Sequence, residues 1–313
     1  MKKILCIGSI TTDIIVTPAD SIPDPGTLRA VNSITQHTGG CAMNAAAALG
    51  KLGVPVALSC RVGRDGMGDF VRNSAAGYGI DVRGVVSGDE PTTVSVVCVS
   101  STGERSFLYS PGSSAAFTLD DISDEVLDDC DIVFVAGAML LTAFDGEPAA
   151  KFFQKARTKG KLTVMDTAWD FDDVWMPKIA AAIPYLDIFM PSVDEARKLT
   201  GIEDHHDIAR ALRDMGANNV IIKVGKDGAY MLTAEGEEID SPTYTAIKPV
   251  DTTGAGDSFC AGFLAGLAQD LPYVDALRLG NAVGTSCIRA IGASTGIMSL
   301  AETEEFMRTH TQG

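Results

Sequence analysis

The sequence of 313 residues predicts an α/β protein: a doubly wound, mainly parallel β-sheet with helices on both faces. Two observations predict this fold class. Short apolar runs, typical of buried parallel strands, alternate along most of the chain with longer segments of helical periodicity. Hydrophobic residues make up 46% of the chain, which is enough for a large core and far from the composition of a disordered protein.

Six segments are predicted as buried strands because they are short, apolar and rich in β-branched residues. These strands are residues 3–8, 56–62, 132–136, 162–166, 188–190 and 220–224. Helices are predicted at residues 41–52, 67–78, 147–159, 193–200, 207–215, 256–268 and 273–290. The first helix begins after Gly39-Gly40 and ends before Gly53, which are common start and stop signals. We expect a single domain over residues 1–313.

Two segments interrupt the alternation of strands and helices. Residues 11–36 contain several prolines and are predicted to be extended. Residues 92–110 alternate in the manner of a β-hairpin around the turn Ser101-Thr102-Gly103-Glu104. Each segment is too thin to form a core alone.

Charge and cysteine usage limit the functional classes. The formal net charge of −16 disfavours non-specific binding to nucleic acid or to an anionic membrane. The seven cysteines show no CxxC spacing and lie mostly among apolar residues, as expected for free thiols in a reducing compartment. The most membrane-like run, residues 132–141, falls short of the roughly twenty apolar residues that span a bilayer. We therefore expect a cytoplasmic protein with neither nucleic acid nor membrane as partner.

The segment Asp251-Thr252-Thr253-Gly254-Ala255-Gly256-Asp257-Ser258 carries the clearest chemical signal. Its glycines leave consecutive backbone N–H groups accessible to an anion, and the helix predicted after it adds a favourable dipole. A carboxylate at Asp257 weakens ground-state binding of that anion, but it is suited to take a proton from the group that attacks the anion. These features predict phosphoryl transfer. The segment is not a P-loop, because no Gly-Lys-Ser/Thr sequence follows.

The stretch DTTGAGDSFCAGFLAGL that begins at Asp251 closely resembles the C-terminal signature of the PfkB (ribokinase-like) sugar kinases. Residues 39–53, GGCAMNAAAALGKLG, resemble the N-terminal signature of the same family. The two signatures occur in the family's order, and the resemblance covers essentially the whole chain. It implies an ATP- and Mg²⁺-dependent kinase that phosphorylates a hydroxyl of a small sugar or sugar derivative. It also implies that residues 11–36 and 92–110 pair into a small β-sheet lid, which in many relatives makes a homodimer contact.

The resemblance assigns roles to the residues of both signatures. Asp257 would be the general base, and the amides of Gly254, Ala255 and Gly256 would stabilise charge on the transferred phosphoryl group. The acceptor pocket would be lined by Asp13, Gly39, Gly40 and Asn44. Structural interpretations remain open, because an acid in the first turn of a helix is stabilised by the dipole, Asp13 suits a turn, and Asn44 could bond to a neighbouring turn.

The resemblance also indicates nucleotide and metal positions. The nucleotide would lie along Lys223, Gly225, Gly228 and Asn281, although Lys223 could be an ordinary residue at a strand end. Relatives usually carry Asn-x-x-Glu after a strand, whereas this chain has Ser192-Val193-Asp194-Glu195. Glu195 keeps the acidic position and would act on Mg²⁺ through water. Ser192 could equally be a helix N-cap, with Glu195 completing a capping box.

Three further expectations concern specificity and ions. Asp251, with backbone oxygens near Ala290 and Gly292, is a candidate site for K⁺, or it could only brace the loop. The acidic and aromatic residues 166–173 could tune substrate choice or form a solvated loop edge. Residues 137–141 lack the carboxylate that ribokinase carries there, which argues against ribose as the acceptor.

Two other functions compete with the sugar kinase. A nucleoside kinase of the same family would need an aromatic platform for the base, for which Phe107 or Tyr109 are candidates. A non-catalytic sugar-binding regulator would keep the fold, but the intact Gly-Ala-Gly-Asp sequence argues against it. The sequence does not identify the sugar.

Overall fold

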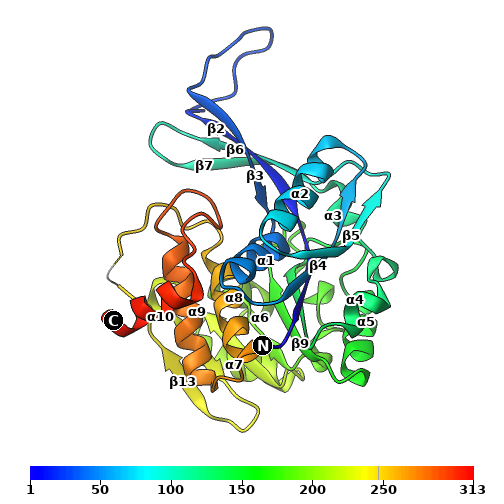
Figure 1. The fold of residues 1–313 in the computed structure, drawn as a ribbon, viewed down its shortest axis with the longest axis vertical. Helices are drawn as coiled ribbons and strands as arrows, with labels where there is room; N and C mark the ends of the chain where they lie inside the picture. Colours follow the sequence, from blue (N-terminus) through cyan, green and yellow to red (C-terminus); the bar gives the residue numbers. More distant parts are fainter. Residues whose placement is uncertain (246) are drawn as a thin grey trace.

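The computed structural model describes residues 1–245 and 247–313, and most of its strands form one nine-stranded sheet (Figure 1). The strands of this sheet are β1 (Ile4–Gly8), β4 (Val56–Gly63), β5 (Asp81–Gly88), β8 (Ile132–Ala138), β9 (Leu162–Thr167), β10 (Ile188–Phe189), β11 (Asn219–Lys223), β12 (Ala229–Leu232) and β13 (Glu238–Ser241). Their order is β13-β12-β11-β10-β9-β8-β1-β4-β5. All neighbours from β11 to β5 are parallel, whereas β12 and β13 add antiparallel pairs at one edge.

Helices cover both faces of this sheet, so the doubly wound fold class predicted from the sequence is confirmed. One face carries α1 (Cys41–Lys51), α2 (Gly66–Gly77), α8 (Ala255–Ala268) and α9 (Tyr273–Cys287). The other carries α4 (Asp124–Asp128), α5 (Glu147–Thr158), α6 (Val193–Thr200) and α7 (His205–Asp214). Alternate side chains of β1 enter the two cores: Ile4 and Cys6 face the first group of helices, and Leu5 and Ile7 face the second.

The six predicted strands and seven predicted helices are all present, and their ends differ from the predicted ones by at most three residues. The sequence analysis missed β5, β12 and β13, which lie at or beside the two edges of the sheet. β5 and β13 contain charged residues, and β12 is an apolar run of only four residues. It also missed the short helices α3 (Gly112–Ala115) and α4, and the C-terminal helix α10 (Leu300–Thr309). No helix within residues 1–245 and 247–313 combines the length and the apolar character needed to cross a membrane.

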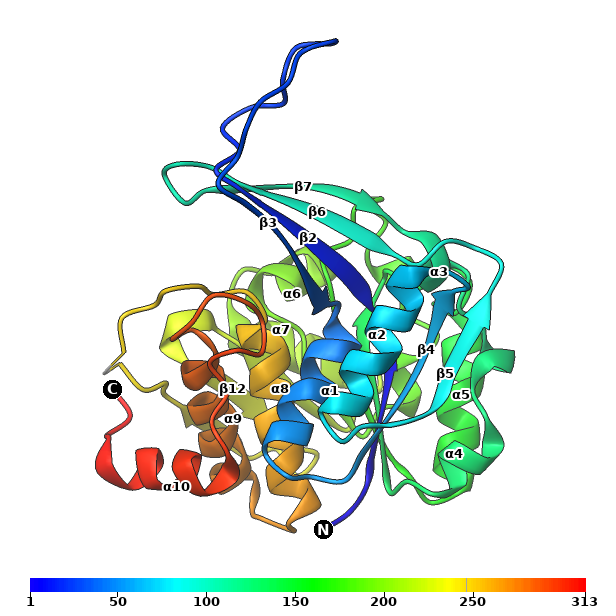
Figure 2. The same cartoon turned by 45° about the horizontal axis from the view of Figure 1, so that its top comes forward.

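A separate four-stranded sheet, called the small sheet below, stands over one end of the large one (Figures 1 and 2). Its strands are β2 (Thr11–Thr17), β3 (Ser33–Gly39), β6 (Val94–Val99) and β7 (Arg105–Ser110), in the order β3-β2-β6-β7. The strands come from the two extended segments of the sequence, and β3 continues to Gly39 beyond the expected end. Asp13 lies opposite Ser95, which lies opposite Tyr109, so these side chains share one face.

The connections explain where a site can form. β1 lies between β4 and β8, so the chain leaves β1 in one direction and later returns to its other side. Such a switch in strand order opens a crevice at the carboxyl ends of the strands, where ligands bind in open α/β sheets. The small sheet and the N-terminus of α8 lie at this end of the large sheet (Figure 2).

Candidate active site

Asp257 lies in the first turn of α8, directly after the two glycines. The N-cap Gly254 has a φ of 75°, a left-handed conformation that side chains rarely adopt, and a Cβ there would lie 2.6 Å from the Cβ of Ala293. Asn44 of α1 donates from Nδ2 to the Asp257 carboxylate over 2.8 Å. Burial raises the pKa of Asp257, although the Asn44 donor opposes that rise. The carboxylate is therefore a stronger proton acceptor than an exposed aspartate.

The N-terminus of α8 also presents free backbone donors. Within the described residues, the N–H groups of Gly254, Gly256 and Asp257 have no acceptor. The N–H of Ala255 instead donates to the carbonyl of Thr252 over 3.2 Å. The sequence analysis expected donors at Gly254, Ala255 and Gly256; Gly254 and Gly256 are free in this structure, Ala255 is bonded to the preceding loop, and Asp257 adds a free N–H. These donors and the helix dipole favour an anion at this position.

The residues predicted for the acceptor pocket lie at the start of α1 and on the small sheet. Gly39 and Gly40 lead into α1, which carries Asn44 at its second turn. A Cβ at Gly39 would lie 2.2 Å from an oxygen of the Asp13 carboxylate, so a larger residue at this position of β3 would collide with that carboxylate. Asp13 accepts a hydrogen bond from the Thr11 hydroxyl over 2.7 Å, and burial raises its pKa. A carboxylate with one oxygen already oriented is suited to accept hydrogen bonds from a polyol.

Lys223, at the carboxyl end of β11, forms a buried ion pair that the sequence analysis did not predict. Its ammonium lies 2.7 Å from each oxygen of Asp166, and the two side chains are 11% and 2% exposed. Burial acts to lower the pKa of Lys223, but Asp166 outweighs it and keeps the ammonium charged. Lys223 also faces the anion site, because a Cβ at Gly256 would lie 3.5 Å from its Nζ.

Glu195 lies near this pair and has a clear local role. Its carboxylate accepts from the Ser192 N–H over 3.0 Å and from the Thr167 hydroxyl over 2.9 Å, and the Ser192 hydroxyl accepts from the Glu195 N–H. This arrangement is a capping box at the start of α6, the structural alternative considered from the sequence. One Glu195 oxygen is fully engaged in it.

The charges around Lys223 fit a divalent cation. Burial is the main cause of the raised pKa values of Asp166 and Asp257, and the Glu195 carboxylate adds to both, whereas Lys223 opposes them. Lys223 supplies one positive charge against these three carboxylates. In the described part of the chain, no ligand atoms of these three come close enough together for direct coordination as a set. The donor set therefore fits Mg²⁺ held through water, as this ion dehydrates reluctantly.

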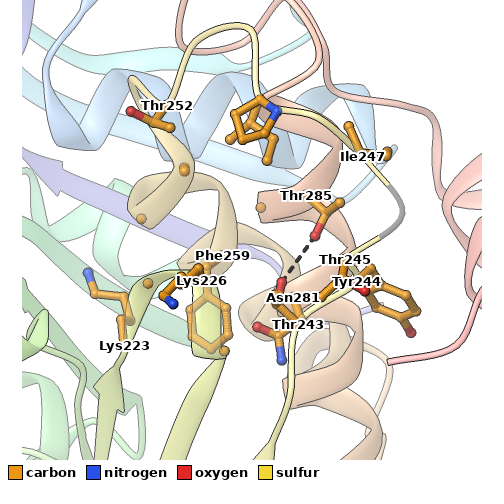
Figure 3. Close-up of a pocket in the computed structure, with 17 residues that line it drawn as sticks. Lys223, Lys226, Thr243, Tyr244, Thr245, Ile247, Thr252, Phe259, Asn281 and Thr285 are labelled. Atoms are coloured by element: carbon orange, nitrogen blue, oxygen red, sulfur yellow. Dashed lines mark hydrogen bonds between the residues drawn. The ribbon is translucent and has the colours of Figure 1, made fainter. Parts of the chain in front are cut away.

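A cavity of about 410 Å³ adjoins the N-terminus of α8 and is lined mostly by apolar surface (Figure 3). It contains the predicted nucleotide residues Lys223, Gly225, Gly228 and Asn281, together with Lys226, Thr243, Tyr244, Ile247, Pro249, Phe259 and Ile288. Its volume is in the range of small-molecule sites. Phe259 and Ile247 suit a flat, apolar ring, while Lys223 lies toward the anion site.

Asn281 contributes to this cavity mainly by holding its wall in place. Its Nδ2 donates to the carbonyl of Ser241 over 2.8 Å and to the Ser241 hydroxyl over 2.9 Å. Both amide hydrogens are therefore engaged with the segment after β13, and only the amide oxygen is available to a ligand. Thr243 and Thr285, 3.2 Å apart, connect the same two elements.

Asp251 lies in front of α8 and is 3% exposed. It accepts from the N–H of Thr253 over 2.9 Å and from the N–H of Gly292 over 2.8 Å, and Arg105 of the small sheet pairs with it at 2.8 Å. Burial acts to raise the pKa of Asp251, but Arg105 and the two amides outweigh it and hold the pKa at about 2. Arg105 also donates to the Thr253 hydroxyl.

Sequence reasoning missed three residues of this region. Asp166 follows a predicted strand and lay within the acidic stretch considered for substrate choice, so its position at a strand end was the available signal. Arg105 gave no signal, because 146 residues separate it from Asp251 and only the folded small sheet brings them together. Phe171 contacts Tyr109 of the small sheet with ring centroids 6.0 Å apart, a pairing that the sequence also leaves hidden.

Comparison with known proteins finds relatives of a single family along almost the whole chain. A family model described as pfkB family carbohydrate kinase matches residues 1–299. The chain is 28% identical over 302 residues to 2-dehydro-3-deoxygluconokinase from Bacillus subtilis (strain 168), and the match covers 90% of each protein.

Solved structures share the fold over nearly the full length. Ribokinase from Arabidopsis thaliana, complexed with ribose and ATP, has a TM-score of 0.87 at 23% identity, covering 98% of this chain and 99% of that one. A protein from E. coli assigned as ribokinase II, in complex with ATP and Mg²⁺, has a TM-score of 0.82 at 23% identity, covering 99% and 100%. At this level of identity the structural likeness establishes the fold alone.

Proposed function

This chain belongs to the pfkB family of carbohydrate kinases, and we propose that it transfers the γ-phosphoryl group of ATP to a hydroxyl of a small sugar or sugar derivative. The observation that carries this proposal is the position of Asp257. Its carboxylate has a raised pKa, lies in the same first turn of α8 as the free amides, and is oriented by Asn44 over 2.8 Å. A base and an anion site thus adjoin each other.

The proposed reaction is a direct in-line transfer. The acceptor hydroxyl, held by Asp13 and the start of α1, gives its proton to Asp257 while its oxygen attacks the γ-phosphorus of ATP. The bond from that phosphorus to the bridging oxygen breaks, and ADP leaves. The free N–H groups of Gly254 and Gly256 and the Lys223 ammonium offset the charge on the phosphoryl oxygens during transfer. The cavity beside Phe259 would hold the adenosine part of ATP.

Mg²⁺, when bound to the nucleotide, supplies positive charge to its phosphate oxygens. Glu195 and Asp166 would hold its water ligands, since both carboxylates lie beside Lys223. The capping box leaves one Glu195 oxygen without a partner within the described residues, so this carboxylate can cap α6 and accept from a bound water together.

The test is ADP release from Mg-ATP with a panel of acceptors: ribose, fructose, ketogluconate-type acids, aminosugars, hexose phosphates and nucleosides. The matched variants are Asp257→Asn, which removes the base, and Asp69→Asn, which neutralises an exposed acid in the first turn of α2. We expect one strong acceptor whose turnover is lost in Asp257→Asn and kept in Asp69→Asn. Near-normal turnover of Asp257→Asn would refute the base, and binding of an acceptor without any ADP release would favour a sugar-binding regulator.

A nucleoside acceptor is the second candidate, and the inner face of the small sheet supports it. Tyr109 shares the face of Asp13 through the register of β2, β6 and β7, and Phe107 follows on the same face. Tyr109 also contacts Phe171 from the loop after β9. A planar base attached to a sugar could stack on such aromatic side chains.

The two acceptor classes are separated by the variant Tyr109→Ala. If the acceptor carries a planar base, Tyr109→Ala raises KM for the nucleoside by roughly 5- to 100-fold, the equivalent of about 1–3 kcal/mol for one lost stacking contact. For a simple sugar, KM changes little in this variant. The control Leu108→Ala alters the opposite face of the same strand.

We further propose that the outer face of the small sheet forms a homodimer interface. Ile14, Val16, Ile34, Val96 and Leu108 alternate with the inner residues and so share this outer face. Ile34 is 65% and Leu108 is 55% exposed, which is a poor arrangement for a sheet in water. Sedimentation of the wild type and of Ile34→Asp/Leu108→Asp tests this proposal. A monomeric wild type would contradict it.

A further inference from the structure

The small sheet touches the body at two separate places along one strand. At one end of β7, Tyr109 contacts Phe171 from the loop after β9. At the other end, Arg105 contacts Asp251 and Thr253 in the loop before α8. Residues 105 and 109 lie on the same face of the strand and roughly 13–14 Å apart. β7 therefore bridges the crevice between the two loops.

The contacts of Arg105 link it to the anion site. Thr253 directly precedes Gly254, the N-cap of α8, and Arg105 reaches both Thr253 and Asp251. Asp251 in turn accepts from the N–H groups of Thr253 and Gly292, so the guanidinium and the carboxylate together hold the turn that aims the amides of α8. The Arg105 side chain is 27% exposed, whereas Asp251 is almost fully buried.

The donors around Asp251 do not fit the monovalent metal ion that the sequence analysis considered there. A hard cation needs oxygen lone pairs, but both Asp251 oxygens already accept from N–H donors, and a guanidinium 2.8 Å away repels a second positive charge.

Several neighbouring carbonyl groups are engaged as well. The Cys287 thiol lies 3.3 Å from the carbonyl oxygen of Thr253 and 3.2 Å from that of Ala293. The ammonium of Lys51 donates to the carbonyl of Ser294 over 2.7 Å and approaches that of Thr295 at 3.3 Å. Protein donors thus occupy four carbonyl oxygens around this loop. Within the described residues the carbonyls of Ala290 and Gly292 have no such donor, so it is the contacts of Asp251 itself that disfavour a metal ion.

We propose that Arg105 is the cation partner of Asp251, so that closure of the small sheet, and not uptake of a monovalent metal ion, neutralises Asp251 beside the anion site. This inference rests on the proposed kinase function. It makes Arg105 a positioning residue: it acts on phosphoryl transfer through Asp251 and Thr253. Without it, an unpaired carboxylate would lie close to the negative charge that is transferred.

The first experiment measures turnover in KCl, NaCl and tetramethylammonium chloride at equal ionic strength. The variants are Arg105→Ala, Arg105→Lys and the control Arg29→Ala, which removes an exposed arginine from the loop between β2 and β3. We expect the wild type and Arg29→Ala to be equally fast in all three salts. Arg105→Ala should lose kcat by roughly 10-fold or more, with Arg105→Lys in between.

Chemical rescue separates a charge effect from a general structural role. Guanidinium chloride at a non-denaturing concentration should restore part of the kcat of Arg105→Ala and leave Arg29→Ala and Asp257→Asn unchanged. A wild type that requires K⁺ for turnover would overturn the proposal. So would an Arg105→Ala variant with wild-type kcat, or one that guanidinium does not rescue.

A second experiment decides the pairing even if no acceptor is phosphorylated. Thermal unfolding of the wild type, Arg105→Ala, Asp251→Asn and the double variant forms a double-mutant cycle. We expect Asp251→Asn to lower Tm much less in the Arg105→Ala background than in the wild type, and the wild-type Tm to be the same in K⁺ and tetramethylammonium salts. Additive effects on Tm, or a wild type stabilised by K⁺, would refute the pairing, whereas absence of ADP release with every acceptor would refute only the kinase function.

Discussion

Asp251 and Asp257 stand at the two ends of one glycine-rich segment, yet their surroundings shift their pKa values in opposite directions. Asp251 accepts from two backbone N–H groups and pairs with Arg105, and its pKa falls to about 2. Asp257 is also removed from water, and although Asn44 donates a hydrogen bond to it, burial raises its pKa. Two carboxylates of the same segment are thus prepared for different tasks.

The difference follows from what each carboxylate faces. Asp251 faces donors from three parts of the chain, which stabilise its charged form and hold it permanently ionised. Burial of Asp257 outweighs the Asn44 amide and the Lys223 ammonium, so its ionised form is less stable and its pKa is raised. A general base requires the second environment, and a structural anchor requires the first. The contrast supports the two proposed roles without reference to any relative.

The largest expected effect comes from changing each aspartate to asparagine and comparing the two variants. Asp257→Asn should lose kcat by about 10²–10⁴-fold, since a general base is removed, while it unfolds at or above the wild-type temperature because a carboxylate with a raised pKa is replaced by a neutral amide. Asp251→Asn should instead lose about 1–3 kcal/mol of stability, since three donors lose a charged acceptor. Measurements of kcat and of Tm for both variants test this difference. Equal losses of kcat and of Tm in the two variants would show that the two aspartates do not have different roles.

The next prediction concerns Lys223, the charged side chain with the largest influence on the pKa of Asp257. Its positive charge lowers the pKa of Asp257 and pairs with Asp166. Lys223→Met leaves the buried Asp166 without its cation, which should cost about 3–5 kcal/mol in the free energy of unfolding. Urea unfolding at neutral pH measures this loss. The control Lys223→Met/Asp166→Leu removes both charges and should regain most of it, whereas an equally unstable double variant would contradict the role of the ion pair.

The sequence predicts the large sheet well because parallel strands buried on both faces are continuous apolar runs, as in Ile132–Ala138. It misses Asp81–Gly88 because this edge strand contains charged residues and two glycines. The C-terminal helix α10 was missed despite a visible signal, since Ser299 and Glu302 have the spacing of a capping box and form one.

The candidate site divides in the same way. The motif around Asp257 predicts the helix start, the glycines and the base, because all lie within one local segment. The partners that distinguish Asp251 from Asp257 come from elsewhere: Arg105 from the small sheet and Asn44 from α1. Local sequence therefore indicates which residues are reactive, and tertiary contacts decide the protonation state of each.

The smallest effect, and the sharpest test of the contrast, concerns Asn44. Its amide donates to Asp257 and favours the ionised carboxylate, so Asn44→Ala should raise the pKa of that carboxylate further. The ionised form is the active base. The acidic limb of the kcat/KM profile should therefore move to higher pH, with the loss of activity greatest at low pH and smallest on the alkaline side. Asn281→Ala, which alters a wall of the nucleotide cavity, should leave the position of that limb unchanged. An unshifted limb in Asn44→Ala would mean that Asp257 does not carry the titration, and that its raised pKa plays no part in the reaction.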